Sequence, residues 1–133
     1  MKVLTIGSFD LLHEGHIKLF ERCARLGELW VGLNSDEFVL HYKKKKPSIP
    51  YDTRAAVIKA LRSVHRVEMN YGQGAALIRR VDPDILAVGS DWMLKDYLAQ
   101  IDMTEYELEK RNILLIYLPY TKNISTTKLK ENL

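Results

Sequence analysis

His13 and His16 are the residues best suited to chemistry in the segment GSFDLLHEGH, residues 7 to 16, which follows a short apolar run. A helix is expected from about Gly15, which places His13 in the turn and His16 in the first helical turn. A helix N-terminus carries unpaired backbone N–H groups and a partial positive charge, so it attracts phosphate. Imidazole N–H groups add donors, and Gly15 lets the backbone approach a ligand closely. The spacing alone leaves a second interpretation open, which is two surface histidines in a loop.

A metal site is the weaker interpretation of this histidine pair. Only one residue separates Glu14 from His16, so the segment is not the H-E-x-x-H pattern of metalloproteases. The remaining histidines, His41 and His65, lie in unrelated segments and supply no obvious third ligand. An anion is therefore the favoured partner, and Gly7 and Ser8 at the end of the apolar run can approach it in the same way.

A run of lysines, Lys43 to Lys46, lies in the segment HYKKKKPSIPY, which is expected to be a loop. Such a run is usually a solvated loop, and the functional alternative is a basic arm that closes over a polyphosphate. Nucleic-acid binding is a third interpretation. A nucleic-acid-binding surface normally has more basic residues with aromatic residues between them, and the segment offers mainly Tyr42 and Tyr51.

Two further polar segments could contact a ligand. In GSDW, residues 89 to 92, Gly89 permits close approach and Asp91 can accept a hydrogen bond from a substrate hydroxyl, ribose or amine. In ISTTKLK, residues 124 to 130, Ser125 and Thr126 can form a phosphate cradle at a helix start. The structural alternatives are a strand-end turn for the first segment and simple helix capping by Ser125 for the second.

Two well-known phosphate-binding patterns are not matched. YGQGAAL, residues 71 to 77, begins like G-x-G-x-x-G, but Leu77 stands at the third glycine and the segment follows the third expected strand. We interpret it as a turn and helix start. No G-x-x-x-x-G-K-[ST] loop occurs, which excludes a P-loop NTPase.

The elements that must position these residues alternate between strands and helices. Strands are expected at 3–6, 29–33, 67–69, 85–88 and 113–118, and helices at 15–26, 53–63, 74–81, 95–111 and from 125 onward. This alternation predicts an α/β fold with a doubly wound parallel sheet of five strands. Ligands bind beyond the carboxyl ends of such strands. The segments after the first, fourth and fifth strands should therefore surround one crevice.

Composition is typical of a single globular domain over residues 1–133, with 47% hydrophobic and 28% charged residues. The net charge of +3 allows an anionic ligand without demanding nucleic acid. One cysteine excludes an intrachain disulfide and favours a reducing compartment. The sequence has no apolar stretch of transmembrane length and no signal-peptide pattern at its start, so a cytoplasmic enzyme is expected.

The order of these segments resembles the cytidylyltransferase family of small nucleotidyltransferases. The resemblance runs through GSFDLLHEGHIKLFERC, LNSDEF, YDTRAAVIKALRSV, VGSDW and ISTTKLKE, nearly the whole chain. It implies a Rossmann-like fold of the H-x-G-H type and transfer of CMP from CTP to a phosphorylated alcohol, which gives a CDP-alcohol and pyrophosphate. It further implies Mg²⁺ bound through the triphosphate with no assigned protein ligand, and a homodimer. Neither nucleic acid nor a membrane is an expected partner.

The resemblance also implies roles for individual residues. His13 and His16 would contact the nucleotide phosphates and assist the transition state, while Lys43 and Lys45 supply positive charge. Arg62 in the helix after the lysine run, together with Lys45, would meet the phosphate of the acceptor. The expected nucleotide-binding residues are Gly7, Ser8, Phe9, Asp10, Gly15, Gly89, Asp91, Ile124, Ser125 and Thr126.

The sequence departs from the family pattern in two places. The family box often reads R-T-E-G-I-S-T-T, whereas here Tyr120 stands at the arginine and Asn123 at the glycine, with Lys122 nearby. The segment 93–112 is longer than its counterpart and is expected to add a helical element beside the crevice. Open alternatives are an adenylyltransferase with an FMN or sugar-phosphate acceptor, a ligand-binding module without catalysis, and a nucleic-acid-binding domain.

Overall fold

The computed structural model describes residues 1–120, which form a parallel sheet of five strands in the order β3-β2-β1-β4-β5. The predicted fold class is therefore confirmed. The strands are β1 (Lys2–Gly7), β2 (Glu28–Asn34), β3 (Arg66–Asn70), β4 (Ile85–Gly89) and β5 (Leu114–Leu118).

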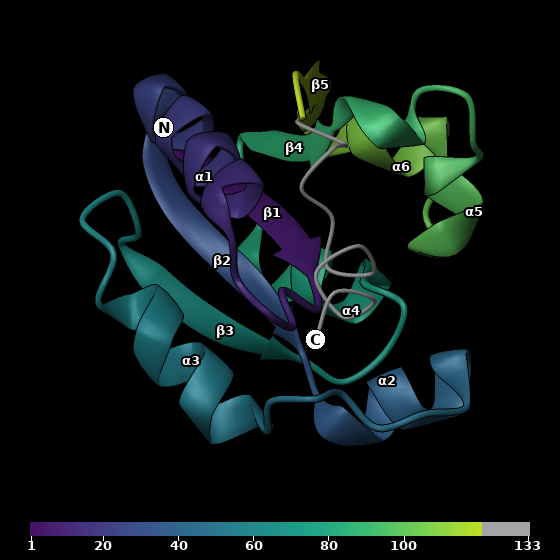
Figure 1. Ribbon diagram of the computed structural model, residues 1–133. Coiled ribbons are helices and arrows are strands. Elements are labelled where there is room, and N and C mark those ends of the chain that lie inside the picture. Colours follow the sequence, from purple (N-terminus) through teal and green to yellow (C-terminus); the bar gives the residue numbers. More distant parts are fainter. Residues whose placement is uncertain (121–133) are drawn as a thin grey trace.

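Helices connect the strands and cover both faces of the sheet (Figure 1). They are α1 (Glu14–Leu26), α2 (Asp36–Lys43), α3 (Tyr51–Lys59), α4 (Ala75–Val81), α5 (Tyr97–Gln100) and α6 (Glu105–Lys110), with the short 3₁₀ helix η1 (Ser90–Trp92) after β4. Two hydrophobic clusters flank the sheet because successive strand side chains point to opposite faces. Val3 packs with side chains of α1 and α3, while its neighbour Leu4 packs with side chains of α4, α5 and α6.

Several expected boundaries differ from the structure. Lys43 belongs to the last turn of α2 rather than to a loop, and the helix ends where Lys44 adopts a left-handed backbone with φ of 60°. Arg62 lies in the turn after α3, not inside a helix. The expected helix over 95–111 is two short helices separated by a turn. The helix expected from residue 125 lies outside the described residues.

The strands β1 and β4 meet where the strand order reverses, and there they pair over a short stretch. Within the described chain, β1 pairs with β4 through Val3 and Leu4, whereas its pairing with β2 continues to Gly7. The two strands therefore separate toward their carboxyl ends, which makes room for a ligand at the switch point. No helix in the described part of the chain is long and apolar enough to cross a membrane.

Candidate active site

A cavity of about 240 Å³ opens at the carboxyl ends of β1, β2 and β4. Its walls contain residues that follow β1, β4 and β5, such as Ser8, Asp91 and Tyr120, as the expected single crevice requires. Of the sequence-predicted residues, the cavity brings together Gly7, Ser8, Phe9, Asp10, His16, Lys43, Gly89 and Asp91. The longer segment 93–112 also reaches the wall, through Tyr97, Gln100 and Ile101.

The histidine pair forms the start of α1. His13 is the N-cap residue, and its Nδ1 accepts a hydrogen bond from the backbone N–H of Gly15 at 3.0 Å. The backbone N–H of His13 in turn donates to Nδ1 of His16 at 3.2 Å. The result is a reciprocal capping box in which histidines take the places usually held by Ser or Thr and by Glu or Gln. The two rings stack with centroids 3.8 Å apart.

This capping arrangement fixes the protonation of both rings. Because each Nδ1 accepts a backbone N–H, the proton of each neutral imidazole resides on Nε2, which is left as a donor. Burial, followed by the repulsion of His13, lowers the pKa of His16 to about 3. Burial also lowers the pKa of His13. At neutral pH the pair therefore offers neutral Nε2–H donors.

The loop between β1 and α1 has an unusual backbone. Phe9 and Leu11 have φ values of 43° and 29°, a left-handed region that side chains with a Cβ rarely adopt. Such strain concentrates at functional sites when the surrounding structure holds it in place. Phe9 is held between His16 and Phe20, with edge-on ring contacts at 5.3 Å and 4.9 Å. Its ring also occupies the space of a Cβ at Gly7, 2.8 Å from that position, so glycine is needed there.

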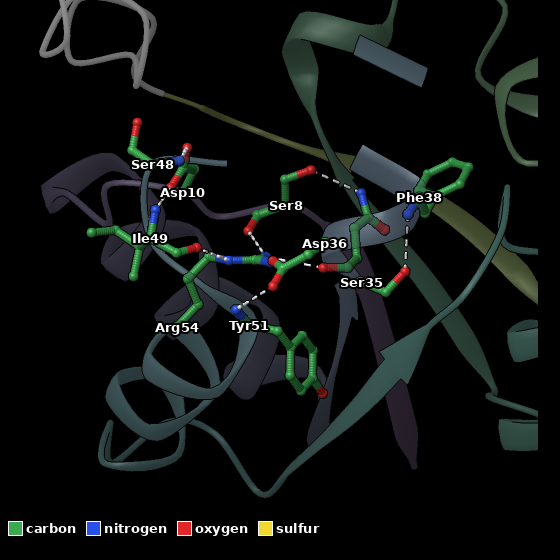
Figure 2. Close-up of polar contacts among 10 residues, drawn as sticks. Ser8, Asp10, Ser35, Asp36, Phe38, Ser48, Ile49, Tyr51 and Arg54 are labelled. Atoms are coloured by element: carbon green, nitrogen blue, oxygen red, sulfur yellow. Dashed lines mark hydrogen bonds and ion pairs between the residues drawn. The ribbon is translucent and has the colours of Figure 1, made fainter. Parts of the chain in front are cut away.

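Arg54 joins several segments near the cavity, and Figure 2 shows its contacts with Ser8, Asp36 and Ile49. Its side chain is 1% exposed and forms an ion pair with Asp36 at 2.6 Å. The same guanidinium donates to three backbone carbonyls, those of Ser8 after β1, Asn34 at the end of β2 and Ile49 after α2. Arg54 thus fixes the ends of β1 and β2 against the segment that leads into α3.

Asp10 clamps the same segment from the other side (Figure 2). Its carboxylate accepts from the backbone N–H groups of Ser48 and Ile49 at 2.7 Å and 2.9 Å. The connection that carries the lysines is therefore tied at its far end to the loop before the histidine box. Asp10 lines the cavity as predicted, and these contacts give it a positioning role as well.

The predicted cationic residues are separated in the structure. Lys43 lines the cavity, whereas Lys45 is exposed and is not part of its wall. Arg62 borders a different hollow, with Ile17 and Glu21 of α1, so this chain does not bring Arg62 to the cavity. Gly15 is buried behind the capping box and contributes its backbone N–H to His13.

The wall on the β4 side is formed by Gly89, Asp91 and Tyr120. A Cβ at Gly89 would lie 2.6 Å from Oδ1 of Asp91 and 3.1 Å from Cβ of Tyr120, so the glycine lets these residues close around the strand end. Its φ of −65° is ordinary, and space rather than conformation is the requirement. Ile124, Ser125 and Thr126 lie outside the described residues, as do Lys122 and Asn123.

Sequence reasoning missed Arg54 as a site residue, and it also missed the side chains of Asn34 and Asn70. Asn70 donates to Asn34, which donates to Ser8 Oγ, so these amides connect the ends of three neighbouring strands. An arginine in an amphipathic helix normally points to solvent, and no spacing signal marks the one that is buried. The asparagines at the ends of two expected strands were a usable signal, since polar strand ends face the ligand edge.

Among residues 1–120, no group of three or more His, Cys, Asp or Glu side chains is arranged to hold a metal ion. The donors that the described cavity does offer are backbone and imidazole N–H groups, amides and a lysine. These groups suit phosphate oxygens. A phosphate-handling site at the switch point of a doubly wound sheet is thus the class of site that this fold defines.

Comparison with known proteins places the chain in a family. The model of the cytidylyltransferase-like family matches residues 4–132, and the chain belongs to that family. Glycerol-3-phosphate cytidylyltransferase of Bacillus subtilis (strain 168) is 39% identical over 99% of this chain and 96% of the relative. FAD synthase of Korarchaeum cryptofilum is 33% identical over 96% of this chain and 88% of the relative.

A solved structure shares the fold. The lipopolysaccharide core biosynthesis protein from Thermoplasma volcanium GSS1 superposes with a TM-score of 0.73 at 26% identity, covering 92% of this chain and 98% of that one. The family resemblance read from the histidine box and its neighbours is therefore confirmed.

Proposed function

We propose that this protein is a cytidylyltransferase that transfers CMP from CTP to a phosphorylated alcohol resembling glycerol 3-phosphate, giving a CDP-alcohol and pyrophosphate. The observation that carries the proposal is the capped histidine pair at the start of α1. Its ring protons reside on Nε2, and His16 lines a cavity whose walls come from both halves of the sheet. The cytidylyltransferase relatives match this chain over nearly its whole length, which supports CTP as the donor.

The reaction needs no nucleophile from the protein. A phosphate oxygen of the acceptor attacks the α-phosphorus of CTP in line, and the bond from that phosphorus to the bridging oxygen of the β-phosphate breaks. Pyrophosphate leaves with the electron pair. Because the attacking group is already an anion, the chain's task is to bring two anions together and stabilise the developing charge.

Particular side chains suit those tasks. His16 lines the cavity and donates Nε2–H to a phosphate oxygen at the start of α1, where the helix dipole adds a partial positive charge. His13 lies outside the cavity wall, and its Nε2–H acts on the phosphates through a neighbouring group. Lys43 supplies a full positive charge to the cavity wall. Asp91 accepts from a hydroxyl or amine of the nucleoside. Arg54 and Asp10 position the loops, and Asp10 also lines the cavity as a proposed nucleotide contact. Lys45, Arg62, Ser125 and Thr126 remain proposed substrate contacts. Lys45 and Arg62 lie outside the cavity wall, and Ser125 and Thr126 lie outside the described residues.

Mg²⁺ fits this site as an ion that is bound by the phosphates of the nucleotide. It prefers oxygen ligands and retains bound waters, so the triphosphate itself can hold it with few protein ligands. Asp91 is a carboxylate in the cavity wall on the β4 side and could supply such an oxygen. When bound, Mg²⁺ neutralises charge on the reacting phosphates.

An adenylyltransferase on the same scaffold is the second candidate. The FAD synthase relatives, at 30% to 33% identity, favour it. The cytidylyltransferase relatives reach 36% to 39% and leave it less supported. We further propose a cytoplasmic homodimer that acts on small molecules rather than on nucleic acid or membranes. The buried lone Cys23 is compatible with a reducing compartment.

The test is a substrate panel. Purified protein, Mg²⁺ and each nucleoside triphosphate are incubated with glycerol 3-phosphate, other phosphorylated alcohols, sugar phosphates or FMN, and pyrophosphate release is followed together with product mass. We expect turnover with CTP and a phosphorylated alcohol. Turnover with ATP but not with CTP would overturn the proposal, and so would the absence of turnover with every nucleotide. Sedimentation of the same sample reports whether it is a dimer.

A further inference from the structure

Tyr120 is fixed in the cavity wall directly after β5. Its backbone N–H donates to Ser90 Oγ at 3.2 Å, which joins the end of β5 to the turn after β4. The absence of a side chain at Gly89 makes the room that Tyr120 occupies. The half-buried phenol lines the same cavity as His16 and Asp91.

The phenol faces both histidines of the capping box. Its hydroxyl oxygen is 3.5 Å from Nε2 of His13, and its ring centroid is 6.4 Å from that of His13 and 6.0 Å from that of His16. Because Nδ1 of His13 accepts the N–H of Gly15, its Nε2 carries the proton and is the donor in this contact. The tyrosine oxygen is therefore the acceptor, and its own hydrogen remains to be donated elsewhere.

The hydroxyl keeps that hydrogen at any ordinary pH. Burial, with the nearby carboxylate of Asp91 adding to it, raises the pKa of Tyr120 to about 12. A neutral O–H at the wall of a cavity that receives a polyphosphate has an obvious acceptor in a phosphate oxygen. Hydrogen bonds in a chain polarise one another, so donation to an anion strengthens the contact from His13. The present 3.5 Å separation is at the long limit of a hydrogen bond, and such contacts often tighten when substrate is present.

We propose that Tyr120 is a catalytic residue of this chain, whose hydroxyl accepts a hydrogen bond from His13 and donates one to a phosphate oxygen of the bound nucleotide. The inference rests on the proposed nucleotidyl transfer. In this arrangement His13, which is not part of the cavity wall, acts on the substrate through Tyr120, whereas His16 lines the cavity directly.

The test compares Tyr120→Phe with Tyr106→Phe, which removes a hydroxyl from an exposed position on α6 that is 67% exposed. Loss of one hydrogen bond to a charged group should lower kcat/KM for CTP about 10- to 100-fold in Tyr120→Phe. KM for the acceptor should stay within about twofold, because the contact is to the nucleotide. Tyr106→Phe should behave as wild type in both measurements, and thermal unfolding should show that both variants fold.

A second measurement examines the contact without turnover. In histidine ring NMR spectra of the ligand-free protein, the His13 Nε2–H resonance should shift in Tyr120→Phe and stay in place in Tyr106→Phe. An active wild type whose Tyr120→Phe variant retains full kcat/KM for CTP would overturn this inference alone. A wild type that transfers no nucleotide would overturn the proposed function, and the catalytic role of Tyr120 with it.

Discussion

At the scale of single residues, the site relies on neutral donors. His13 and His16 are buried and have lowered pKa values, and the pKa of Tyr120 is raised, so none of these side chains is charged at neutral pH. Positive charge in the described wall comes from Lys43 and from the dipole of α1. Neutral donors lose less on burial than cations do, and they can be aimed in advance at the place where negative charge develops.

Replacing His16 by Gln separates its chemistry from its structural role. Glutamine is a favoured residue at this capping position, and its side-chain oxygen can accept the N–H of His13 as Nδ1 does now. The ring donor is lost, so kcat should fall on the order of 100-fold, which corresponds to about 3 kcal/mol in barrier. Pyrophosphate release under saturating substrates measures this. Unchanged turnover would remove His16 from the mechanism.

The same variant should change how stability depends on pH. The folded pKa of His16 is about 3 against an ordinary value of 6.5, so between these values the unfolded chain binds more protons than the folded one. Stability from neutral His16 is therefore complete above pH 6.5 and is lost as pH falls toward 3. In urea titrations at several pH values, His16→Gln should show a shallower decline than wild type. Replacing the exposed His41 by Gln is the control for loss of a histidine outside the capping box.

The sequence was enough to predict where these residues lie, in the turn and the first helical turn, but not their charge state. The spacing of His13 and His16 and the helix expected after them predict an anion site. Their neutrality depends on burial, and Phe9, whose strained backbone brings its ring against His16, is one of the residues packed there. No pattern predicts a phenylalanine with φ of 43°, because the surrounding tertiary structure holds it there.

At the scale of elements, the loops around the cavity are fixed by buried polar side chains. Arg54 and Asp10 join the ends of β1 and β2 to the segment before α3. The alternation of apolar runs with helical segments was sufficient to predict all five strands and their parallel orientation. They were not sufficient for α2, where Lys43 extends the helix because Lys44 can adopt a left-handed C-cap conformation.

Arg54→Met should destabilise the protein by about 3 kcal/mol. It leaves carbonyls of Ser8, Asn34 and Ile49 without their buried donor and removes the partner of Asp36. The midpoint of urea unfolding measures the loss. Arg79→Met is the matched control, since the ion pair of Arg79 with Glu107 is at the surface and should contribute little to stability. Equal effects of the two substitutions would contradict the anchoring role.

Gly89→Ala should impair activity more than stability. The added methyl group would lie 2.6 Å from Asp91 and 3.1 Å from Tyr120, so both wall residues must move, while the backbone itself accommodates alanine. A displacement of about 1 Å in a positioned group can cost on the order of 100-fold in rate, and we expect kcat/KM for CTP to fall by at least tenfold. Gly72→Ala provides the control because nothing lies within 4 Å of its added Cβ. A fully active Gly89→Ala variant would show that the wall tolerates the shift.

At the scale of the whole molecule, the cavity belongs to both halves of the sheet. β1, β2 and β3 form one half, β4 and β5 form the other, and the halves pair directly through Val3 and Leu4. The switch-point rule predicts the place of the site from the order of elements alone. The segment 93–112 lies beside the crevice as expected, but the rule could not predict that it would also pack Tyr97, Ile101 and Leu108 against one face of the sheet. That placement depends on the tertiary packing of the short helices α5 and α6 against apolar side chains of the sheet and of α4.

A ligand that contacts both halves should stabilise them together. Gly7 and His16 come from one half and Gly89 and Tyr120 from the other, so bound CTP would add contacts where the direct pairing of β1 and β4 stops. At a CTP concentration of about 100 times Kd, stability should rise by about 2.7 kcal/mol, which for a chain of this length raises Tm by roughly 10 °C.

Differential scanning fluorimetry measures this rise in Tm. Inorganic triphosphate is the comparison, because it offers phosphate without the nucleoside that Asp91 would contact. Equal shifts for both ligands would mean that the β4 side contributes nothing to nucleotide binding. A larger shift with CTP, together with hydrogen-exchange protection in both β1 and β4, would show that the nucleotide bridges the two halves.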